Sequence, residues 1–449
     1  QPRTATSTTA AAAMSARITP PSHASSFQRW NSLSPGSFDS SIGGSSSASG
    51  REASTTVRQA AAGVLLAATF GFSAFFSGTD GELPLQLWCA LCCVLWGWVS
   101  PRRAEGVPAA GLVAVFALLW SLVAWRTSIA PSFSVAGTWG VMLLPLAILA
   151  TGSARSPWYA LAVAMPVSAL LVLLSFADLY GPGALRPVGL RDPNNVATLA
   201  NLLWIPVAAG LLALRHQRPW QRFALCLVGL CASTVLVASA SRAGIAIALA
   251  AALAVCGLGL LSRRPLAVGV LVLGGLLGLL PGLTVTQPGE LAIAGDFANV
   301  GSSGIGLRFR LVAASLEMFA SAPLTGTGPN TFFLLYQGLR PLQEQRTAGY
   351  FAHNDWVQLP QEFGLPMLVV MLLLLGWLLL LAWRALRALL AAPQGDGRAR
   401  LAELGLIMAI GSALVHATVN FTLYSPPVVL LLGVMIGVVA RGAPAPGVG

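Results

Sequence analysis

Long apolar runs recur along almost the whole chain and constrain its fold more than any other feature. Each is close to the roughly 20 residues that cross a bilayer as a helix. They lie at 58–77, 84–99, 107–125, 137–151, 157–177, 196–214, 221–240, 243–261, 265–282, 365–387, 401–419 and 424–440. Only 9% of the 449 residues are charged, against about a quarter in a soluble domain. The runs predict an all-α polytopic membrane protein with about 12 transmembrane helices and exclude a soluble fold.

The basic residues predict how these helices are oriented. All 26 basic side chains are arginine, and the formal net charge is +11. Arginines gather in alternate connections, at 102–103, 155, 215–222, 263–264 and 384–400, as they do in cytoplasmic loops. Both termini are therefore expected in the cytoplasm. Because the arginines follow this topological pattern, nucleic acid is not an expected partner.

The apolar runs divide the chain into five parts. Residues 1–55 are rich in Ser, Ala, Thr and Gly and are expected to form a disordered cytoplasmic segment. The first membrane helix is expected to act as an uncleaved signal anchor. Residues 56–282 contain transmembrane helices 1–9, residues 365–441 contain helices 10–12, and residues 442–449 form a C-terminal tail. The helix count places 283–364, between helices 9 and 10, on the non-cytoplasmic face.

This large loop has helical segments of its own. Residues 307–320 have the apolar spacing of an amphipathic helix, 326–330 (GTGPN) have turn composition, and 331–339 are predicted to form a short aromatic helix. Loops of this length within a compact fold are usually functional. The loop is therefore the first place to look for a site.

Cysteine and histidine usage gives no indication of a metal centre. The six cysteines all lie in apolar runs and are interpreted as small membrane-embedded hydrophobic residues. The four histidines do not occur in an HExxH or paired-cysteine spacing. We expect no metal and no cofactor.

Eight arginines lie on the non-cytoplasmic face, where topology requires none. They are Arg126, Arg186, Arg191, Arg242, Arg308, Arg310, Arg340 and Arg346. Taken singly, each could equally be a solvated loop residue or a contact to a lipid headgroup.

Two of these arginines accompany predicted helix starts. Asp192 is a plausible N-cap for the sixth membrane helix, beside Arg191, and Ser239 or Ser241 can cap the eighth, with Arg242 in its first turn. Helix N-termini attract anions through their free amides and the helix dipole. The two helix starts and their arginines are expected to converge on one negatively charged ligand.

Arg308 and Arg310 cannot point the same way if 307–320 is helical, because positions two apart differ by about 200° around the axis. Arg308 shares its face with Val312, Ser315 and Phe319, and we favour it as the inward residue.

His353 is the candidate general base. It is the only histidine in the loop, Asn354 and Asp355 follow it, and either of these can cap a short helix with Gln358 in a capping box. An imidazole there is expected to titrate near neutral pH, as a general base requires. A lone histidine can also be purely structural.

Further residues are expected to line the site. His416, near the outer end of the eleventh helix, either lines the cavity or caps a polar seam. The candidate lining residues are Arg186, Asn194, Arg310, Asn354, Asp355 and His416.

One motif resembles a known family. His-Asn at 353–354, nine residues and then Gly364 resemble the motif of the bacterial O-antigen ligase family. RPVGLRDPNNVA, SRAG and LRFRLVAASLEMFASAPLTGTGPNTF are similar to other segments of the same superfamily. Val312 replaces a common aromatic residue, and Met367 stands where a small residue usually closes the histidine motif.

The resemblance implies a glycosyltransferase that needs neither nucleotide nor metal. It would transfer O-antigen polysaccharide from undecaprenyl diphosphate to lipid A–core oligosaccharide, at the periplasmic face of the bacterial inner membrane. Its expected partners are these two glycolipids and membrane lipids. His353 would take the proton of the acceptor hydroxyl while Arg191, Arg242 and Arg308 hold the diphosphate, and displacement would invert the anomeric carbon.

Other functions remain open from the sequence. An O-antigen polymerase would use the same donor with a second carrier-linked glycan, and a protein O-oligosaccharyltransferase would use a protein acceptor. A transporter or flippase of lipid-linked glycans should carry ionisable groups or broken helices near the bilayer midplane. The spans contain almost no charge, which favours an enzyme.

Overall fold

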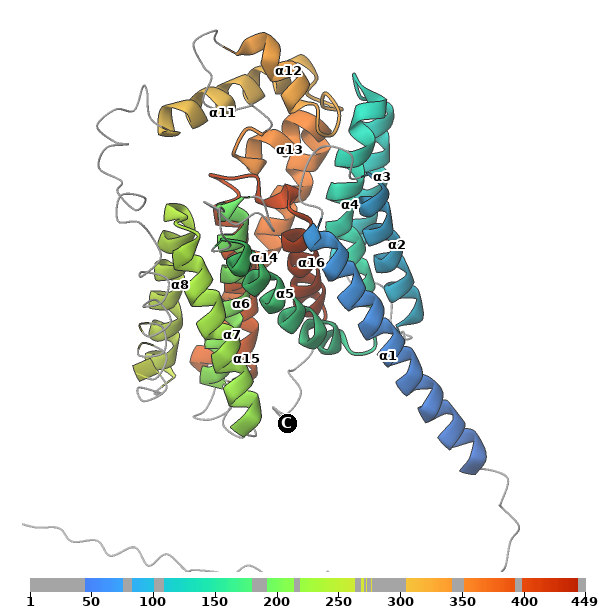
Figure 1. The fold of residues 1–449 in the computed structure, drawn as a ribbon, viewed down its shortest axis with the longest axis vertical. Coiled ribbons are helices and arrows are strands. Elements are labelled where there is room, and N and C mark those ends of the chain that lie inside the picture. Colours follow the sequence, from blue (N-terminus) through green and yellow to red (C-terminus); the bar gives the residue numbers. More distant parts are fainter. Residues whose placement is uncertain are drawn as a thin grey trace, which may run out of the picture. The chain divides into compact units, whose positions relative to one another are not determined.

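The computed structural model describes residues 45–75, 83–100, 109–179, 192–213, 219–262, 304–340, 351–391 and 398–442, with isolated positions between 268 and 276. From Ala53 onward the described residues belong to one compact unit. Within these ranges the secondary structure is helical and contains no strand (Figure 1). The predicted all-α class is confirmed.

Eleven of the twelve apolar runs coincide with helices. These are α1 (Ser45–Phe75), α2 (Leu83–Val99), α3 (Ala109–Arg126), α4 (Pro131–Ser153), α5 (Pro157–Leu179), α6 (Pro193–Ala213), α7 (Pro219–Ala238), α8 (Arg242–Leu261), α14 (Leu365–Ala391), α15 (Arg398–His416) and α16 (Pro426–Ala440). The run at 265–282 lies mostly outside the described residues. By length and composition, five described helices can cross a membrane, namely α4, α5, α6, α8 and α14. The figure of twelve spans stays a prediction.

The N-terminal segment differs in part from the expectation. α1 begins at Ser45, inside the segment 1–55 that was expected to be disordered, and residues 1–44 lie outside the described ranges. Once a helix has formed, each added residue gains a backbone hydrogen bond, so the helix extends beyond its apolar run.

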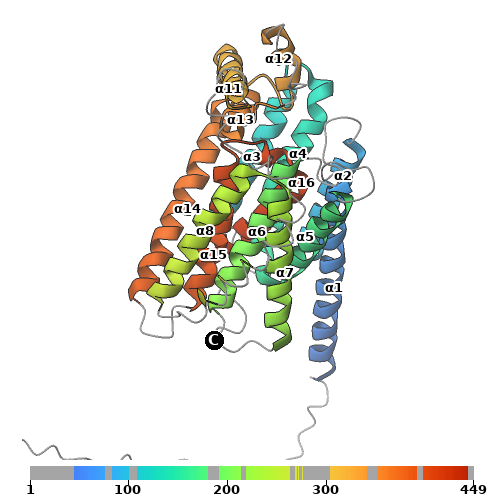
Figure 2. The same cartoon turned by 60° about the vertical axis from the view of Figure 1, so that its left-hand side comes forward.

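The described part of the segment between α8 and α14 contains three helices within the predicted loop 283–364. They are α11 (Gly304–Ser321), α12 (Phe332–Leu339) and α13 (Asp355–Phe363). In Figures 1 and 2, α11 and α12 lie beyond one end of the bundle, with α13 between them and the long helices. The helices predicted at 307–320 and 331–339 are confirmed.

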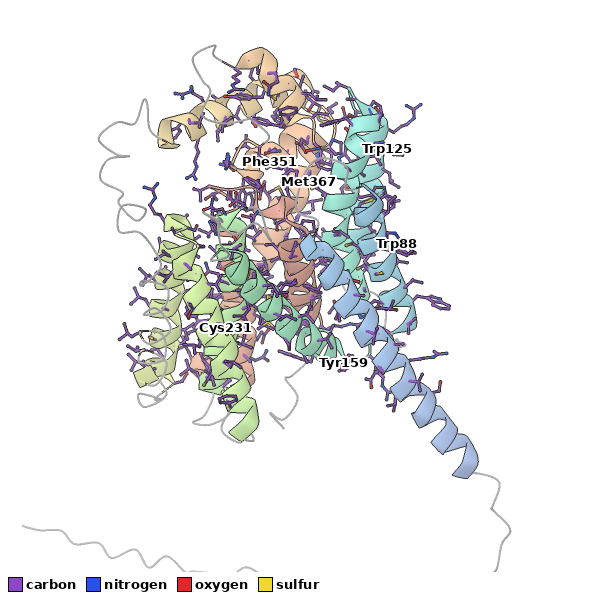
Figure 3. The ribbon with its side chains drawn as sticks, viewed as in Figure 1. Trp88, Trp125, Tyr159, Cys231, Phe351 and Met367 are labelled. Atoms are coloured by element: carbon purple, nitrogen blue, oxygen red, sulfur yellow. The ribbon has the colours of Figure 1, made fainter. Side chains whose placement is uncertain are left out.

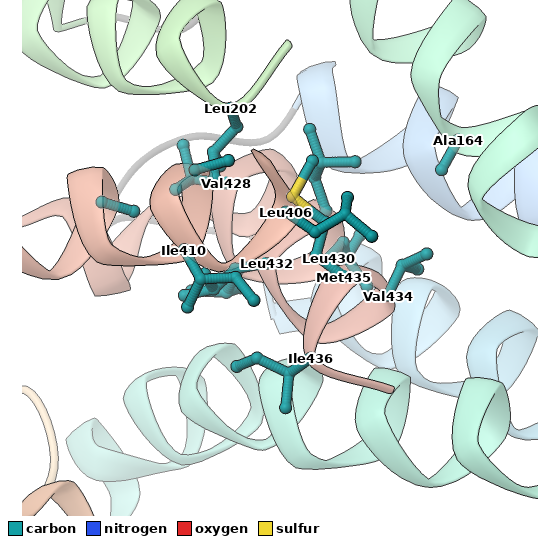
Figure 4. Close-up of a cluster of buried hydrophobic side chains, with 14 of the residues drawn as sticks. Ala164, Leu202, Leu406, Ile410, Val428, Leu430, Leu432, Val434, Met435 and Ile436 are labelled. Atoms are coloured by element: carbon teal, nitrogen blue, oxygen red, sulfur yellow. The ribbon is translucent and has the colours of Figure 1, made fainter. Parts of the chain in front are cut away.

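Helix α16 lies in the middle of the bundle. Every residue of Pro426–Val439 is buried, and the helix packs mainly against α4, α5 and α15. Figure 4 shows its side chains beside Leu406 and Ile410 of α15 and Leu202 of α6. A Cβ on Gly433 would lie 2.7 Å from the Cβ of Ala147 in α4. Small residues bring the helices this close, as in other membrane bundles.

The outer faces of several helices expose large apolar side chains. Leu253 of α8 is 75% exposed, and Leu379 and Trp383 of α14 are more than half exposed. Trp88 of α2, labelled in Figure 3, is also exposed. A soluble monomer rarely presents such large apolar surface. With their apolar length, these helices indicate an integral membrane protein.

Candidate functional site

The N-termini of α6 and α8 are capped as predicted. Asp192 Oδ1 accepts a hydrogen bond from the Asn194 amide at 2.6 Å, and Pro193 follows as the first helical residue. At α8, Ser241 Oγ accepts from the Gly244 amide at 3.2 Å. Both helix starts thus use a side-chain oxygen to satisfy one free amide.

These two N-termini are joined to each other. Ser241 Oγ donates a 2.7 Å hydrogen bond to Asn194 Oδ1, and Asn201 Nδ2 donates to the Gly244 carbonyl at 3.1 Å. A Cβ on Gly244 would lie 2.6 Å from that of Ala197, so the helices are in backbone contact. The partial positive charges of two helix starts therefore add at one place.

The loop before α12 is held against α13 by backbone hydrogen bonds. The amides of Thr327 and Gly328 donate to the carbonyls of Gln361 and Glu362, both at 3.0 Å, and Leu365 donates to Pro323 at 2.8 Å. These hydrogen bonds fix the loop before α12 to α13 and to the start of α14.

Glycines in the two facing segments permit that contact. Gly326 has φ +72° and Gly364 has φ +77°, both in the left-handed region. A Cβ on Gly364 would lie 2.2 Å from the Leu324 carbonyl oxygen, and one on Gly326 would lie 2.3 Å from that of Glu362. Both positions require glycine, which gives a structural reason for the final Gly of the His-Asn motif.

His353 lies just before α13 in a constrained conformation. Its φ is +55°, which is uncommon for a residue with a side chain and is often found at functional sites. Its ring meets Phe421 edge-on with centroids 5.1 Å apart, and Phe351 stacks on Phe421 at 4.2 Å. Figure 3 shows Phe351 at the same end of the bundle as α11. The next helix begins at Asp355, whose amide donates to the Ala417 carbonyl at 2.8 Å.

The pKa of His353 is lower than the value near neutral pH that was expected from the sequence. Burial and, to a smaller extent, the charge of Arg308 lower the pKa of His353, a hydrogen bond with the Asn420 side chain opposes them, and together they bring the pKa to about 4. Removal from water disfavours the charged imidazolium. The imidazole is therefore neutral at neutral pH, with a lone pair available, but it is a weaker base than expected.

Arg308 is the inward arginine of α11. It is half-buried, whereas Arg310 is exposed, in agreement with the expectation. Burial raises the pKa of Asp192, and the Asp192 hydrogen bonds to Asn194 and Asn195 and the charge of Arg308 lower it. Because Arg308 acts electrostatically on both Asp192 and His353, it connects the start of α6 with the histidine.

The other candidate site residues lie in different environments. Arg242 is the first residue of α8 and is exposed. Asn354 caps α13 and accepts from the Trp356 amide at 3.0 Å. Gln358 does not complete a capping box, because its Oε1 accepts from the Ala352 amide at 2.7 Å. Arg186 and Arg191 lie outside the described residues.

His416 is almost completely buried at the end of α15. It is 1% exposed, and its Nδ1 lies 2.7 Å from Thr198 Oγ1 of α6. His416 was expected to line the site or to cap a polar seam. The contact with Thr198 places it against α6, one of the two helices whose N-termini attract anions.

Sequence reasoning missed a buried polar network behind His353. Glu362 accepts hydrogen bonds from the Asn330 amide at 2.7 Å, Gln358 Nε2 at 3.0 Å and the Tyr424 hydroxyl at 2.8 Å. Burial raises the pKa of Glu362 more than these hydrogen bonds lower it, so the pKa is about 7. The signal was present, because Asp355, Gln358 and Glu362 lie on one face of a short helix.

Asp355 is the second carboxyl of this network. Its Oδ2 accepts from the Leu423 amide at 2.8 Å. Burial raises its pKa well above the ordinary value, hydrogen bonds to Leu423 and Thr422 oppose this, and the charge of Glu362 raises it again. Among the described residues, no group of three or more His, Cys, Asp and Glu side chains is arranged to hold a metal ion.

Comparison with known proteins gives a family match that covers this region. Residues 227–372 match the family model described as O-Antigen ligase. The matched range includes Ser241, Arg308 and His353, together with the glycines that join the loop to α13. No curated protein sequence matches the chain.

Proposed function

We propose that the chain is an O-antigen ligase, a proposal supported by the match of residues 227–372 to the family model described as O-Antigen ligase. It transfers O-antigen polysaccharide from undecaprenyl diphosphate to lipid A–core oligosaccharide at the periplasmic face of the inner membrane. The observation that carries the proposal is the position of Arg308, which acts electrostatically on both His353 and the N-terminal cap of α6. One cation thus acts electrostatically on both the proton acceptor and the anion-attracting helix start.

The diphosphate is the leaving group and gains negative charge as its bond to the sugar breaks. The paired N-termini of α6 and α8 and the guanidinium of Arg308 are suited to stabilise that charge. Arg242, at the first position of α8, and Arg191 complete the proposed diphosphate site. Arginine binds phosphate oxygens through charge-assisted, often bidentate hydrogen bonds.

His353 acts as the general base in this proposal. A hydroxyl oxygen of the acceptor attacks the anomeric carbon, its proton passes to the imidazole, and the carbon–oxygen bond to the diphosphate breaks. The single displacement inverts the anomeric carbon. Because the charge of Arg308 helps lower the His353 pKa, a bound diphosphate that neutralises Arg308 raises that pKa and makes the base stronger.

A lipid substrate is consistent with the apolar space beneath α13. A cavity of about 270 Å³ is lined by side chains of α3, α4, α13, α14 and α16, among them Leu144, Trp356, Leu359, Met371 and Ile436. Almost all of its lining is apolar. An acyl or prenyl chain can pack there without leaving a polar group unpaired.

O-antigen polymerase is the second candidate. Met367, buried at the start of α14, replaces the small residue that usually closes the ligase histidine motif. A polymerase would use the same diphosphate site but a second carrier-linked glycan as acceptor.

One transfer assay separates these functions. The purified chain in lipid nanodiscs is given undecaprenyl-diphosphate-linked glycan with either lipid A–core or a second carrier-linked glycan. Ligase activity gives glycan on lipid A–core, and polymerase activity gives a longer carrier-linked glycan. Transfer to neither acceptor would contradict both proposals. Retention of the donor's anomeric configuration in the product would contradict the single displacement.

A further inference from the structure

His416 offers a second imidazole whose tautomer can be assigned from its hydrogen bonds. Thr198 Oγ1 lies 2.9 Å from the Asn194 carbonyl oxygen and 2.7 Å from His416 Nδ1. A carbonyl oxygen only accepts, so the single hydroxyl proton of Thr198 is directed to Asn194. His416 Nδ1 must then carry the proton and donate it to Thr198. In the neutral imidazole this leaves Nε2 as a lone-pair acceptor.

That acceptor is buried and unused. His416 Nε2 is solvent-inaccessible and has no hydrogen-bond partner among the described residues. Asn420 Oδ1, four residues further along, is also buried with no donor within hydrogen-bond distance in that part of the chain. The Nδ2 of Asn420 donates to Asn195 Oδ1 at 3.0 Å, and the side chain raises the pKa of His353 as a hydrogen-bonding group. A buried acceptor without a donor is costly, and two of them on one turn indicate a missing ligand that donates hydrogen bonds.

The two acceptors belong to the same region as the proposed base. The Ala417 carbonyl, next to His416, accepts from the Asp355 amide at 2.8 Å. Arg308 interacts electrostatically with both His353 and His416, and the Asn420 side chain acts on His353. The turn after α15 is therefore part of one site with His353 and Arg308.

We propose that His416 Nε2 and Asn420 Oδ1 bind hydroxyl groups of a sugar, beside the diphosphate site. The proposal rests on the proposed function and assigns a substrate group to residues that have no role in the diphosphate site. Lone pairs attract O–H donors and repel phosphate oxygens, so the two acceptors select a neutral sugar and leave the phosphates to the arginines. The sugar belongs either to the acceptor or to the donor glycan.

His416→Asn is the discriminating variant. An asparagine side chain can place an N–H near the position of Nδ1, which keeps the donor to Thr198, but it has no atom at the position of Nε2. The full chain is purified in lipid nanodiscs, and KM is measured for the undecaprenyl-diphosphate-linked glycan and for lipid A–core. Loss of one neutral hydrogen bond should raise one of these KM values roughly three- to tenfold. The glycan whose KM rises identifies the sugar that is bound.

Binding of undecaprenyl diphosphate without a sugar is the second measurement. It should be unchanged in His416→Asn and weakened in Arg308→Gln. Asn420→Ala, which removes the other acceptor, should reproduce the KM change if the first variant fails to fold. Thr418→Ala is the matched control, because Thr418 lies on the same turn but is exposed.

The outcomes separate this proposal from the proposed function. If His416→Asn folds and leaves both KM values unchanged, the hydroxyl site is wrong. Weaker binding of sugar-free undecaprenyl diphosphate to this variant would also overturn it, because His416 would then contact phosphate. If the wild-type chain transfers glycan to neither acceptor, the proposed function itself has failed.

Discussion

The Tyr424 hydroxyl donates a 2.8 Å hydrogen bond to Glu362 Oε2, which joins the turn before α16 to the short helix that follows His353. The Leu423 amide makes a parallel connection to Asp355 at 2.8 Å. Two buried carboxyls of α13 thus hold this helix to the bundle and fix the backbone on which His353 is presented.

The raised pKa of Glu362 predicts a pH-dependent stability. Its pKa rises from an ordinary 4.5 to about 7, so between these values the folded chain binds more protons than the unfolded chain. The contribution of Glu362 to stability should therefore fall as pH rises across this window, by on the order of 2–3 kcal/mol. The lowered pKa of His353 acts in the opposite direction between about 4 and its ordinary value of 6.5, so the contribution of Glu362 is measured as the difference between wild type and Glu362→Gln in thermal unfolding in detergent at the two pH values. A difference that does not change with pH would show that Glu362 does not contribute in this way.

His353→Asn should abolish most transfer without unfolding the chain. Asparagine tolerates the left-handed backbone at this position, whereas His353→Ala adds backbone strain to the loss of the imidazole. Loss of a general base typically costs about 10²–10⁴-fold in rate. The measurement is kcat with both glycolipids saturating, alongside the melting temperature. Wild-type turnover in the Asn variant would exclude His353 as the base.

The lowered pKa of His353 predicts a flat pH profile near neutrality. Protonation removes the lone pair, so activity should fall only as pH drops toward a pKa of about 4. We expect kcat/KM to be nearly constant between about pH 5.5 and about pH 8. A histidine with an ordinary pKa would instead show a loss centred near about pH 6.5. Arg308→Gln should move the acid limb to higher pH, because it removes a charge that lowers the His353 pKa.

Arg308 and Arg310 should differ sharply when each is replaced by glutamine. Arg308 is half-buried and close to Asp192 and His353, whereas Arg310 is exposed. Removing a preorganised charge from a leaving-group site costs about 10²–10³-fold in rate. Arg308→Gln should therefore lose activity to that extent, and Arg310→Gln should remain near wild type in the same transfer assay. Equal effects would contradict the orientation of α11.

Gly364→Ala should destabilise the junction of α13 and α14. Its Cβ would lie 2.2 Å from the Leu324 carbonyl oxygen, and the backbone at φ 77° and ψ −175° is essentially restricted to glycine, at a cost of about 1–3 kcal/mol for other residues. Gly376→Ala in α14 is the matched control, since a Cβ there meets nothing within 4 Å. Melting temperatures of the two variants test the difference. A Gly364→Ala protein as stable as the control would show that the close backbone contact is absent.

The sequence predicted the elements well where a local signal defines them. Apolar length located the long helices, and Asp192 and Ser241 identified two helix starts because capping depends on residues next to each other in the chain. Helical geometry separated the directions of Arg308 and Arg310, and the residues that share each face favoured Arg308 as the inward one. These are local rules, and the structure agrees with them.

Contacts between distant segments were not predictable in the same way. Glu362 bonds to Asn330 and Tyr424, and Thr198 bonds to His416, across separations of 32, 62 and 218 residues. No periodicity encodes such pairs. The His353 pKa was misjudged for the same reason, because it depends on burial of the ring beside Phe421 and on the charge of Arg308, which come from other parts of the fold.

The most deeply buried described helix, α16, is also the last of them to be synthesised. Until Pro426–Val439 enters the membrane, α4, α5 and α15 have no central partner. The turn that carries Leu423 and Tyr424 arrives at the same time, so the hydrogen bonds from this turn to Asp355 and Glu362 of α13 form only then. Completion of the bundle core and of the carboxyl network behind His353 is therefore one event.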